Sequence, residues 1–251
     1  MFTVAEREEL RERLVGAARA DSRVVSAALV GSGARGGEDQ WSDIDLALSL
    51  RPGIDPADVV GDWTTRLYRD CAAVDHLDVW SGGTRFRVFL LASTLQVDIA
   101  FWAEADFGAT GPDFRLLFGT ANQLPRPAPP AAAELVGWGW LYALHARASL
   151  ARGRVLQAEY MVSGLRNQVL ALACRRHGLP AVQGRGMDDL PASVRVPISA
   201  AFARSLDPAE LRRAFTAACH ALLHEARQTD ADLTDRIDTA VRNLAHPPGP
   251  D

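Results

Sequence analysis

Three aspartates form the most specific chemical pattern in the sequence. Asp43 and Asp45 alternate with apolar residues in SDIDLALSL, and Asp98 is flanked in the same way in LQVDIAFW. Side chains two residues apart in a strand point to one face, so the first two carboxylates lie ~6–7 Å apart. Carboxylates this close repel each other and need a cation between them. The pattern predicts a Mg²⁺ site, with Asp98 from a separate strand completing a two-metal clamp for phosphoryl chemistry.

The turn before the paired aspartates is suited to binding phosphate. The apolar run VVSAALV ends at Gly31-Ser32, and Arg35 follows three residues later. A strand that turns into a helix here would expose backbone N–H groups and a hydroxyl to an anion. A glycine-serine turn with nearby aspartates is usually only a solvated surface turn. The alternation of aspartates within two apolar strands favours the catalytic interpretation instead.

The sequence contains no lysine, so all 27 of its basic Lys+Arg positions are arginine. This excludes a Schiff-base lysine and the GK[ST] type of phosphate loop. Any cationic side chain that grips a phosphate must be an arginine, which can bind it through two N–H groups.

The elements that position the aspartates follow from the hydrophobic pattern. It predicts helices over 4–20 and 56–72 and strands over 24–32, 42–50, 76–80, 85–92 and 95–102. In the two aspartate strands the aliphatic side chains face away from the carboxylates. We therefore expect a sheet with helices on its aliphatic side and an open, acidic opposite side.

A change from short strand-like segments to long helical patterns divides the chain into two parts. NQLPRPAPPAAAE carries four prolines and predicts a linker at 125–130, between a catalytic domain at 1–124 and a domain at 131–251. Long helical patterns follow, over 131–151, 154–177, 208–228 and 229–244, with a loop at 178–191 and a disordered tail, HPPGPD. The layout is α+β: a mixed sheet with helices on one face, followed by a helical bundle.

Composition narrows the range of partners. The 251 residues carry a net charge of −4, so no basic surface for nucleic acid is expected. The N-terminal segment is charged from Glu6 onward, unlike a signal peptide. No apolar run approaches the ~20 residues that a membrane span needs. Three scattered cysteines predict reduced thiols rather than a metal knuckle. We expect a cytoplasmic protein that contacts neither nucleic acid nor membrane.

These residues resemble the DNA polymerase β-like nucleotidyltransferase superfamily, through G31-S32, D43-I-D45-L and the later strand with D98 between hydrophobic residues. GSGARG…SDIDL followed by a helical half is most similar to the nucleotidyltransferases that modify lincosamide and aminoglycoside antibiotics. The resemblance implies Mg²⁺-dependent transfer of NMP from an NTP to a small-molecule hydroxyl, with release of pyrophosphate. It also implies a homodimer as one option.

The resemblance assigns roles to the motif residues. Gly31 and Ser32 would hold the β- and γ-phosphates, Asp43 and Asp45 would ligate Mg²⁺, and Asp98 would lie near the acceptor hydroxyl. The lysine that often contacts nucleotide in such enzymes is absent here, so an arginine must replace it or the contact is missing.

The helical half offers a second catalytic carboxylate. Glu159, Ser163 and Arg166 lie along one face of the helix over 154–177. Glu159 could accept the acceptor's proton and Arg166 could contact the triphosphate. An equally good interpretation is a pair that only stabilises a solvated or interdomain face. The sequence leaves open whether Asp98 or Glu159 is the base.

One alternative function belongs to a different class. The same motifs would suit a nucleotide-binding regulatory protein, or an antitoxin-type protein that transfers AMP to a protein partner. Such antitoxins are usually minimal single domains, whereas this chain carries its own helical half, which favours the small-molecule enzyme. Neither the acceptor nor the preferred NTP can be read from the sequence.

Overall fold

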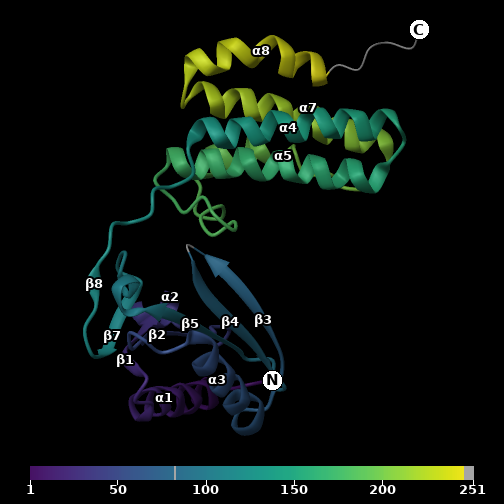
Figure 1. The fold of residues 1–251 in the computed structure, drawn as a ribbon. Helices are drawn as coiled ribbons and strands as arrows, with labels where there is room; N and C mark the ends of the chain where they lie inside the picture. Colours follow the sequence, from purple (N-terminus) through teal and green to yellow (C-terminus); the bar gives the residue numbers. More distant parts are fainter. Residues whose placement is uncertain (82, 246–251) are drawn as a thin grey trace. The chain divides into compact units, whose positions relative to one another are not determined.

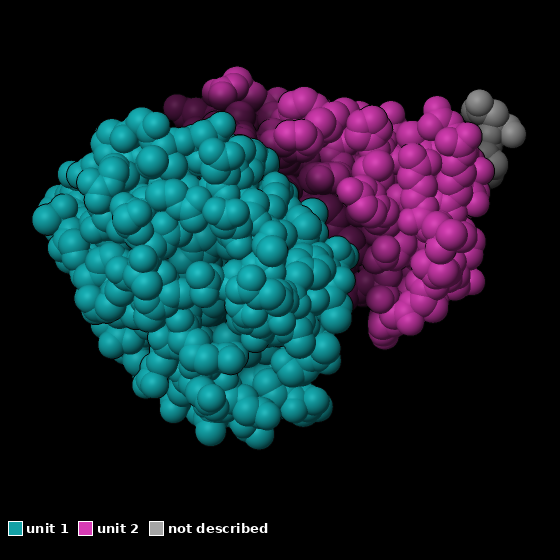
Figure 2. All heavy atoms as spheres, turned by 60° about the horizontal axis from the view of Figure 1, so that its bottom comes forward, with its two compact units in different colours: residues 1–127 teal, residues 128–251 magenta. Residues whose placement is uncertain are grey.

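The computed structural model describes residues 1–81 and 83–245. The chain divides into two compact units, residues 1–127 and 128–251, coloured separately in Figure 2. The division falls inside the proline-rich segment predicted as a linker. The tail predicted to be disordered, HPPGPD, lies outside the described residues.

The first unit begins with a helix and builds most of its strands before residue 104. Its elements are α1 (Val4–Ala20), β1 (Val24–Val30), α2 (Gly31–Arg35), β2 (Ile44–Leu50), α3 (Pro56–Asp70), β3 (Ala73–Ser81), β4 (Thr84–Leu91), β5 (Gln96–Ala103), η1 (Glu104–Asp106), β6 (Gly108–Ala109), β7 (Phe114–Phe118) and β8 (Asn122–Gln123). The elements after β5 were not predicted, whereas the short α2 begins at Gly31, where the sequence predicts a strand that turns into a helix.

Local sequence explains where the two long helices start. Thr3 and Glu6 form a reciprocal capping box at the start of α1. Asp55 caps α3 by accepting a hydrogen bond from the backbone N–H of Ala57, and Pro56 occupies the first turn, where no N–H is needed. Both helices therefore begin where the sequence pattern predicts.

Six strands form one mixed sheet in the order β3-β4-β5-β2-β1-β7 (Figure 1). Strands β2 and β5 are parallel, and every other neighbouring pair is antiparallel. The parallel pair stands at the centre and joins segments about fifty residues apart in the chain. The mixed sheet of the predicted α+β class is thereby confirmed.

Helices α1 and α3 cover one face of this sheet (Figure 1). The core there includes Leu14 of α1, Trp63 of α3 and the aliphatic side chains of the aspartate strands, such as Leu46 and Ile99. Burying this much apolar surface is the main source of the unit's stability.

The opposite face differs from the acidic side that the sequence led us to expect. Small residues of its central strands, Ala28, Ala47 and Ala100, pack beneath Phe107, which follows η1. Aspartates occupy one row of this face, and apolar side chains lie on both sides of that row. Residues 104–123, which sequence reasoning left without structure, thus cover part of the face.

The second unit is helical. It comprises α4 (Ala132–Ala151), α5 (Val155–Arg176), α6 (Ala192–Ser199), α7 (Pro208–Arg227) and α8 (Ala231–Ala245). The four long helices match the predicted ranges closely, and α4, α5, α7 and α8 pack around a core of alanine and leucine side chains. Helix α6 was not predicted, because Pro197 lies inside it and weakens the helical pattern. Among the described residues no helix is long and apolar enough to cross a bilayer.

Candidate metal and nucleotide site

The three aspartates singled out in the sequence converge at one place in the first unit. In the parallel pairing of β2 with β5, Asp45 stands directly beside Asp98, and Asp43 immediately precedes β2. One carboxylate oxygen from each lies within 4.8 Å of the other two, and all three side chains are half-buried. Within the described part of the chain this is the only such group of three. A donor set made only of carboxylate oxygens fits a hard cation such as Mg²⁺.

Gln96 links two members of this cluster. Its Nε2 donates to Asp98 Oδ1 at 3.0 Å and to Asp43 Oδ2 at 3.3 Å. The pKa of Asp98 is raised to about 6, mainly by burial and also by the charge of Asp43, with the Gln96 hydrogen bond acting in the opposite direction. Gln96 precedes Asp98 by two residues on the same strand face, a spacing that could have marked it as part of the site.

Residue 31 must be a glycine because the carboxylate of Asp45 lies directly against it. It has a positive φ of 64°, and a Cβ built there would lie 2.5 Å from Asp45 Oδ2 and 3.4 Å from Asp45 Cγ. Any side chain at residue 31 would therefore occupy the space of the carboxylate. The turn predicted to bind phosphate and the predicted metal ligands are thus in direct contact.

The backbone amide of Gly31 is used differently from our expectation. Its N–H donates to the carbonyl oxygen of Asp113 at 3.1 Å, so it is already hydrogen-bonded within the fold. The side chain of Asp113 also pairs with Arg35, with Nε and Oδ1 2.8 Å apart. Arg35 and Asp113 are both more than half exposed, so this pair is weak and easily exchanged. Asp113, which precedes β7, therefore binds both Gly31 at the start of α2 and Arg35 at its end.

A buried arginine supports the segment that leads into Asp43, and sequence reasoning missed it. Arg7 of α1 is 1% exposed, and its Nη1 donates to the carbonyl oxygens of Asp39 and Ser42. Its Nε lies 3.5 Å from Glu38 Oε1, and Glu38 also pairs with Arg11. In the sequence Arg7 looks like any charged residue of an exposed helical face. Its burial depends on a loop more than thirty residues away.

Glu159 and Arg166 belong to the second unit, so the structure does not place them with the aspartates. Ser163 Oγ donates to Glu159 Oε1 at 2.5 Å, as their spacing on α5 allows. The guanidinium of Arg166 lies 4.1 Å from the ring centroid of Phe202, and burial lowers the pKa of Arg166. Glu159 and Ser163 lie along one face of α5 as expected. The catalytic role of Glu159 and the nucleotide-binding role of Arg166 stay predictions.

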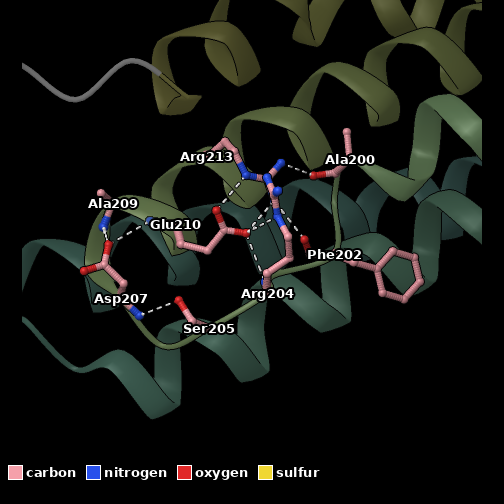
Figure 3. A network of polar contacts seen from close by, with 8 residues as sticks. All are labelled: Ala200, Phe202, Arg204, Ser205, Asp207, Ala209, Glu210 and Arg213. Atoms are coloured by element: carbon pink, nitrogen blue, oxygen red, sulfur yellow. Dashed lines mark hydrogen bonds and ion pairs between the residues drawn. The ribbon is translucent and has the colours of Figure 1, made fainter.

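A polar network fixes the loop that carries Phe202 (Figure 3). Arg213 of α7 donates to the carbonyl oxygens of Ala200 and Phe202. Glu210 accepts hydrogen bonds from Arg213 and from the side chain and backbone of Arg204. The ring against which Arg166 packs is thereby anchored to the start of α7.

Comparisons with known proteins add one finding. The sequence matches no described protein family and no curated protein. Among solved structures the chain is similar to the crystal structure of an aminoglycoside 6-adenyltransferase from Bacillus subtilis. The TM-score is 0.41 and the sequence identity 11%, over 97% of this chain and 99% of that one. The proposals below therefore rest on the geometry of the aspartates and of the Gly31 turn.

Proposed function

We propose that the protein is a Mg²⁺-dependent nucleotidyltransferase, which transfers NMP from an NTP to a hydroxyl group of a small, antibiotic-like molecule. The observation that carries the proposal is the convergence of Asp43, Asp45 and Asp98 against the Gly31 turn. A clustered set of carboxylates beside a glycine turn serves phosphoryl transfer, because the site must hold metal and phosphate together.

Asp43 and Asp45 would hold the metal, with Asp98 as a shared third ligand. Bound Mg²⁺ would offset the negative charge that develops on the transferring group and on pyrophosphate. Gln96 would keep the side chains of Asp43 and Asp98 oriented through its two hydrogen bonds. The crowding of like charges is itself the reason why a cation should bind here.

The chemical step has a simple balance. The acceptor oxygen forms a bond to the α-phosphorus, the bond from that phosphorus to the β-phosphate oxygen breaks, and pyrophosphate leaves. The hydroxyl proton must go to a carboxylate, and Asp98, the member of the cluster that lies on the separate strand β5, is the first candidate for the general base. Glu159 remains the second candidate base, with Ser163 holding its carboxylate in place.

The triphosphate would be held by the turn and by arginines. Gly31 allows the backbone to approach closely, and Ser32 contributes its hydroxyl. Arg35 would exchange its surface pair with Asp113 for a phosphate oxygen. Arg166, packed on Phe202, would supply a second cation from the helical unit.

The test is transfer of label from the α-phosphate of an NTP. The protein is incubated with Mg²⁺, a mixture of four α-labelled NTPs and a panel of small hydroxyl compounds. We expect labelled small products, and we expect Asp45→Asn to reduce their formation by on the order of 1,000-fold with the melting temperature preserved. Asp232→Asn, on the outer helix α8, is the matched control and should keep full activity.

Each other outcome has a defined meaning. Label on a protein band would favour transfer of AMP to a protein partner and overturn the small-molecule proposal. Full activity of Asp45→Asn would overturn the metal assignment. Absence of Mg²⁺-dependent NTP binding by the wild-type protein, measured by calorimetry, would overturn the proposed function altogether.

A further inference from the structure

The register of the sheet continues the aspartate row outward to an edge strand. Asp45 of β2 stands beside Asp98 of β5, Asp98 stands opposite Val88 of β4, and Val88 stands opposite Leu77 of β3. Paired residues in adjacent strands project to the same face. Beyond the carboxylates, the face opposite α1 and α3 therefore continues with aliphatic side chains. Strand β3 is the last strand on this side and forms an edge of the sheet.

These side chains form an uncovered surface, which we name the apolar floor and define as Leu77, Val79, Val88 and Leu90. Leu77 is 64% exposed, Leu90 49% and Val79 44%. A shallow depression of about 150 Å³ lies over part of the floor, and both Leu77 and Gln96 line it. It is large enough for a small alkyl or ring group, whereas a whole drug-sized ligand needs roughly 300 Å³ or more.

The charges around the apolar floor limit what can bind there. Arg85 and Arg87 of β4 face the other side of the sheet, where both lie close to Asp78. Among the described residues that line the depression, Asp75, opposite Leu90, is the only carboxylate, and His76 is the only other ionisable side chain. The surface thus offers apolar contact and a single carboxylate, which suits an apolar group with at most one amine. Any further amine placed on the floor itself would be left without a partner there.

We infer that the acceptor of the proposed reaction carries an apolar substituent next to its reacting hydroxyl, and that this substituent packs on the apolar floor while the hydroxyl lies at Asp98. The inference rests on the proposed function. The floor is assigned to the acceptor because it is continuous with the aspartate cluster: Val88 is the direct neighbour of Asp98 in the sheet. The acceptor class is then a hydroxyl compound with an apolar body, in contrast to a polycationic amino sugar.

The test compares acceptors and variants in one assay. Pairs of alcohols that differ only by an alkyl group beside the hydroxyl are assayed with wild type, Val88→Thr and Leu77→Asn. We expect each variant to lower kcat/KM for the alkyl-bearing alcohol by about 10-fold and to leave the plain alcohol unaffected, since a few buried methylene groups are worth that much. Val4→Thr on α1, an exposed valine on the helix side of the sheet, is the matched control.

Two measurements separate this inference from the function on which it rests. Mg²⁺-dependent NTP binding tests the donor site and involves no acceptor, so its failure would remove the proposed function itself. If NTP binds and polycationic amino sugars are the best acceptors, with kcat/KM unchanged in both variants, the inference is wrong while the function stands. A third outcome is that light scattering shows a dimer for wild type and a monomer for Leu77→Asn, with acceptor kinetics unchanged. The floor would then be a contact surface for a second copy of the chain, and the inference would also be wrong.

Discussion

Two clusters of charged side chains, one in each unit, use the same chemical groups in opposite ways. In the first unit Asp43, Asp45 and Asp98 gather with like charge, and burial raises the pKa of Asp98 to about 6. In the second unit the side chain of Arg213 and the backbone of Arg204 lower the pKa of Glu210 to about 2. The first environment disfavours the carboxylate charge, and the second favours it.

The difference indicates where charge serves folding and where it serves binding. The Glu210 network fixes a loop onto α7, so its charges are balanced within the fold (Figure 3). In the aspartate cluster the neutral side chain of Gln96 links Asp43 to Asp98, and Gly31 packs against Asp45. A fold retains such a repulsive arrangement when a ligand completes it, and strongly shifted carboxylates are common at functional sites for this reason.

Among variants that leave all three aspartates in place, the largest effect is expected from adding one methyl group beside the aspartate cluster. Gly31→Ala should lower transfer activity by on the order of 100-fold, because its Cβ would displace Asp45 and small misplacements in active sites cost that much. Gly36→Ala is the matched control: its φ is 66°, yet nothing lies within 4 Å of its added Cβ. Equal activity losses in the two variants would show that backbone strain, and not the position of Asp45, decides the outcome.

A smaller effect is expected from the buried arginine that supports the cluster. Arg7→Met should lower the free energy of unfolding of the first unit by roughly 2 kcal/mol, since hydrogen bonds from a charged group to two backbone carbonyls are lost. It should also weaken Mg²⁺-dependent NTP binding, because the segment before Asp43 loses its support. Arg13→Met, at an exposed position of the same helix, provides the comparison in urea denaturation. Unchanged NTP binding in a destabilised Arg7→Met protein would mean that Arg7 serves only the fold.

Parts of this site could be predicted from sequence because they depend on local pattern. Alternation placed Asp43 and Asp45 on one strand face, and helical periodicity located α1 and α7 closely. Other parts depend on which distant segments meet. Arg7 is buried only because the loop at 38–42 folds over it, and the apolar floor becomes visible only once β3, β4 and β5 are in register.

Short elements escaped prediction for a related reason. Strand β7 has five residues and a mixed burial pattern, so its sequence FRLLF lacks a clear alternation. It is nevertheless paired to β1, and Asp113 just before it holds Gly31 and Arg35. Such a strand is defined by the edge that it completes rather than by its own propensity.

Relieving the repulsion should stabilise the protein while harming its activity. In the presence of EDTA, Asp98→Asn should raise the melting temperature by about 2 °C, because a half-buried carboxylate beside Asp43 is replaced by a neutral group. The same variant should lose most transfer activity with Mg²⁺ present. A lower melting temperature in EDTA would mean that the Asp98 charge is already compensated within the fold, so that the two clusters would not differ in this respect.

The smallest effect is expected from the opposite cluster, where the charge stabilises the fold. The pKa of Glu210 in the folded protein is about 2, below its ordinary value of 4.5, so its contribution is complete above pH 4.5 and is lost as the pH falls toward 2. Glu210→Gln should therefore melt below wild type at pH 7, and the two curves should converge near pH 2. Glu134→Gln, at an exposed position of α4, is the control. If the gap between Glu210→Gln and wild type were the same at every pH, the carboxylate would act through its shape and hydrogen bonds, and its charge would not be what separates it from Asp98.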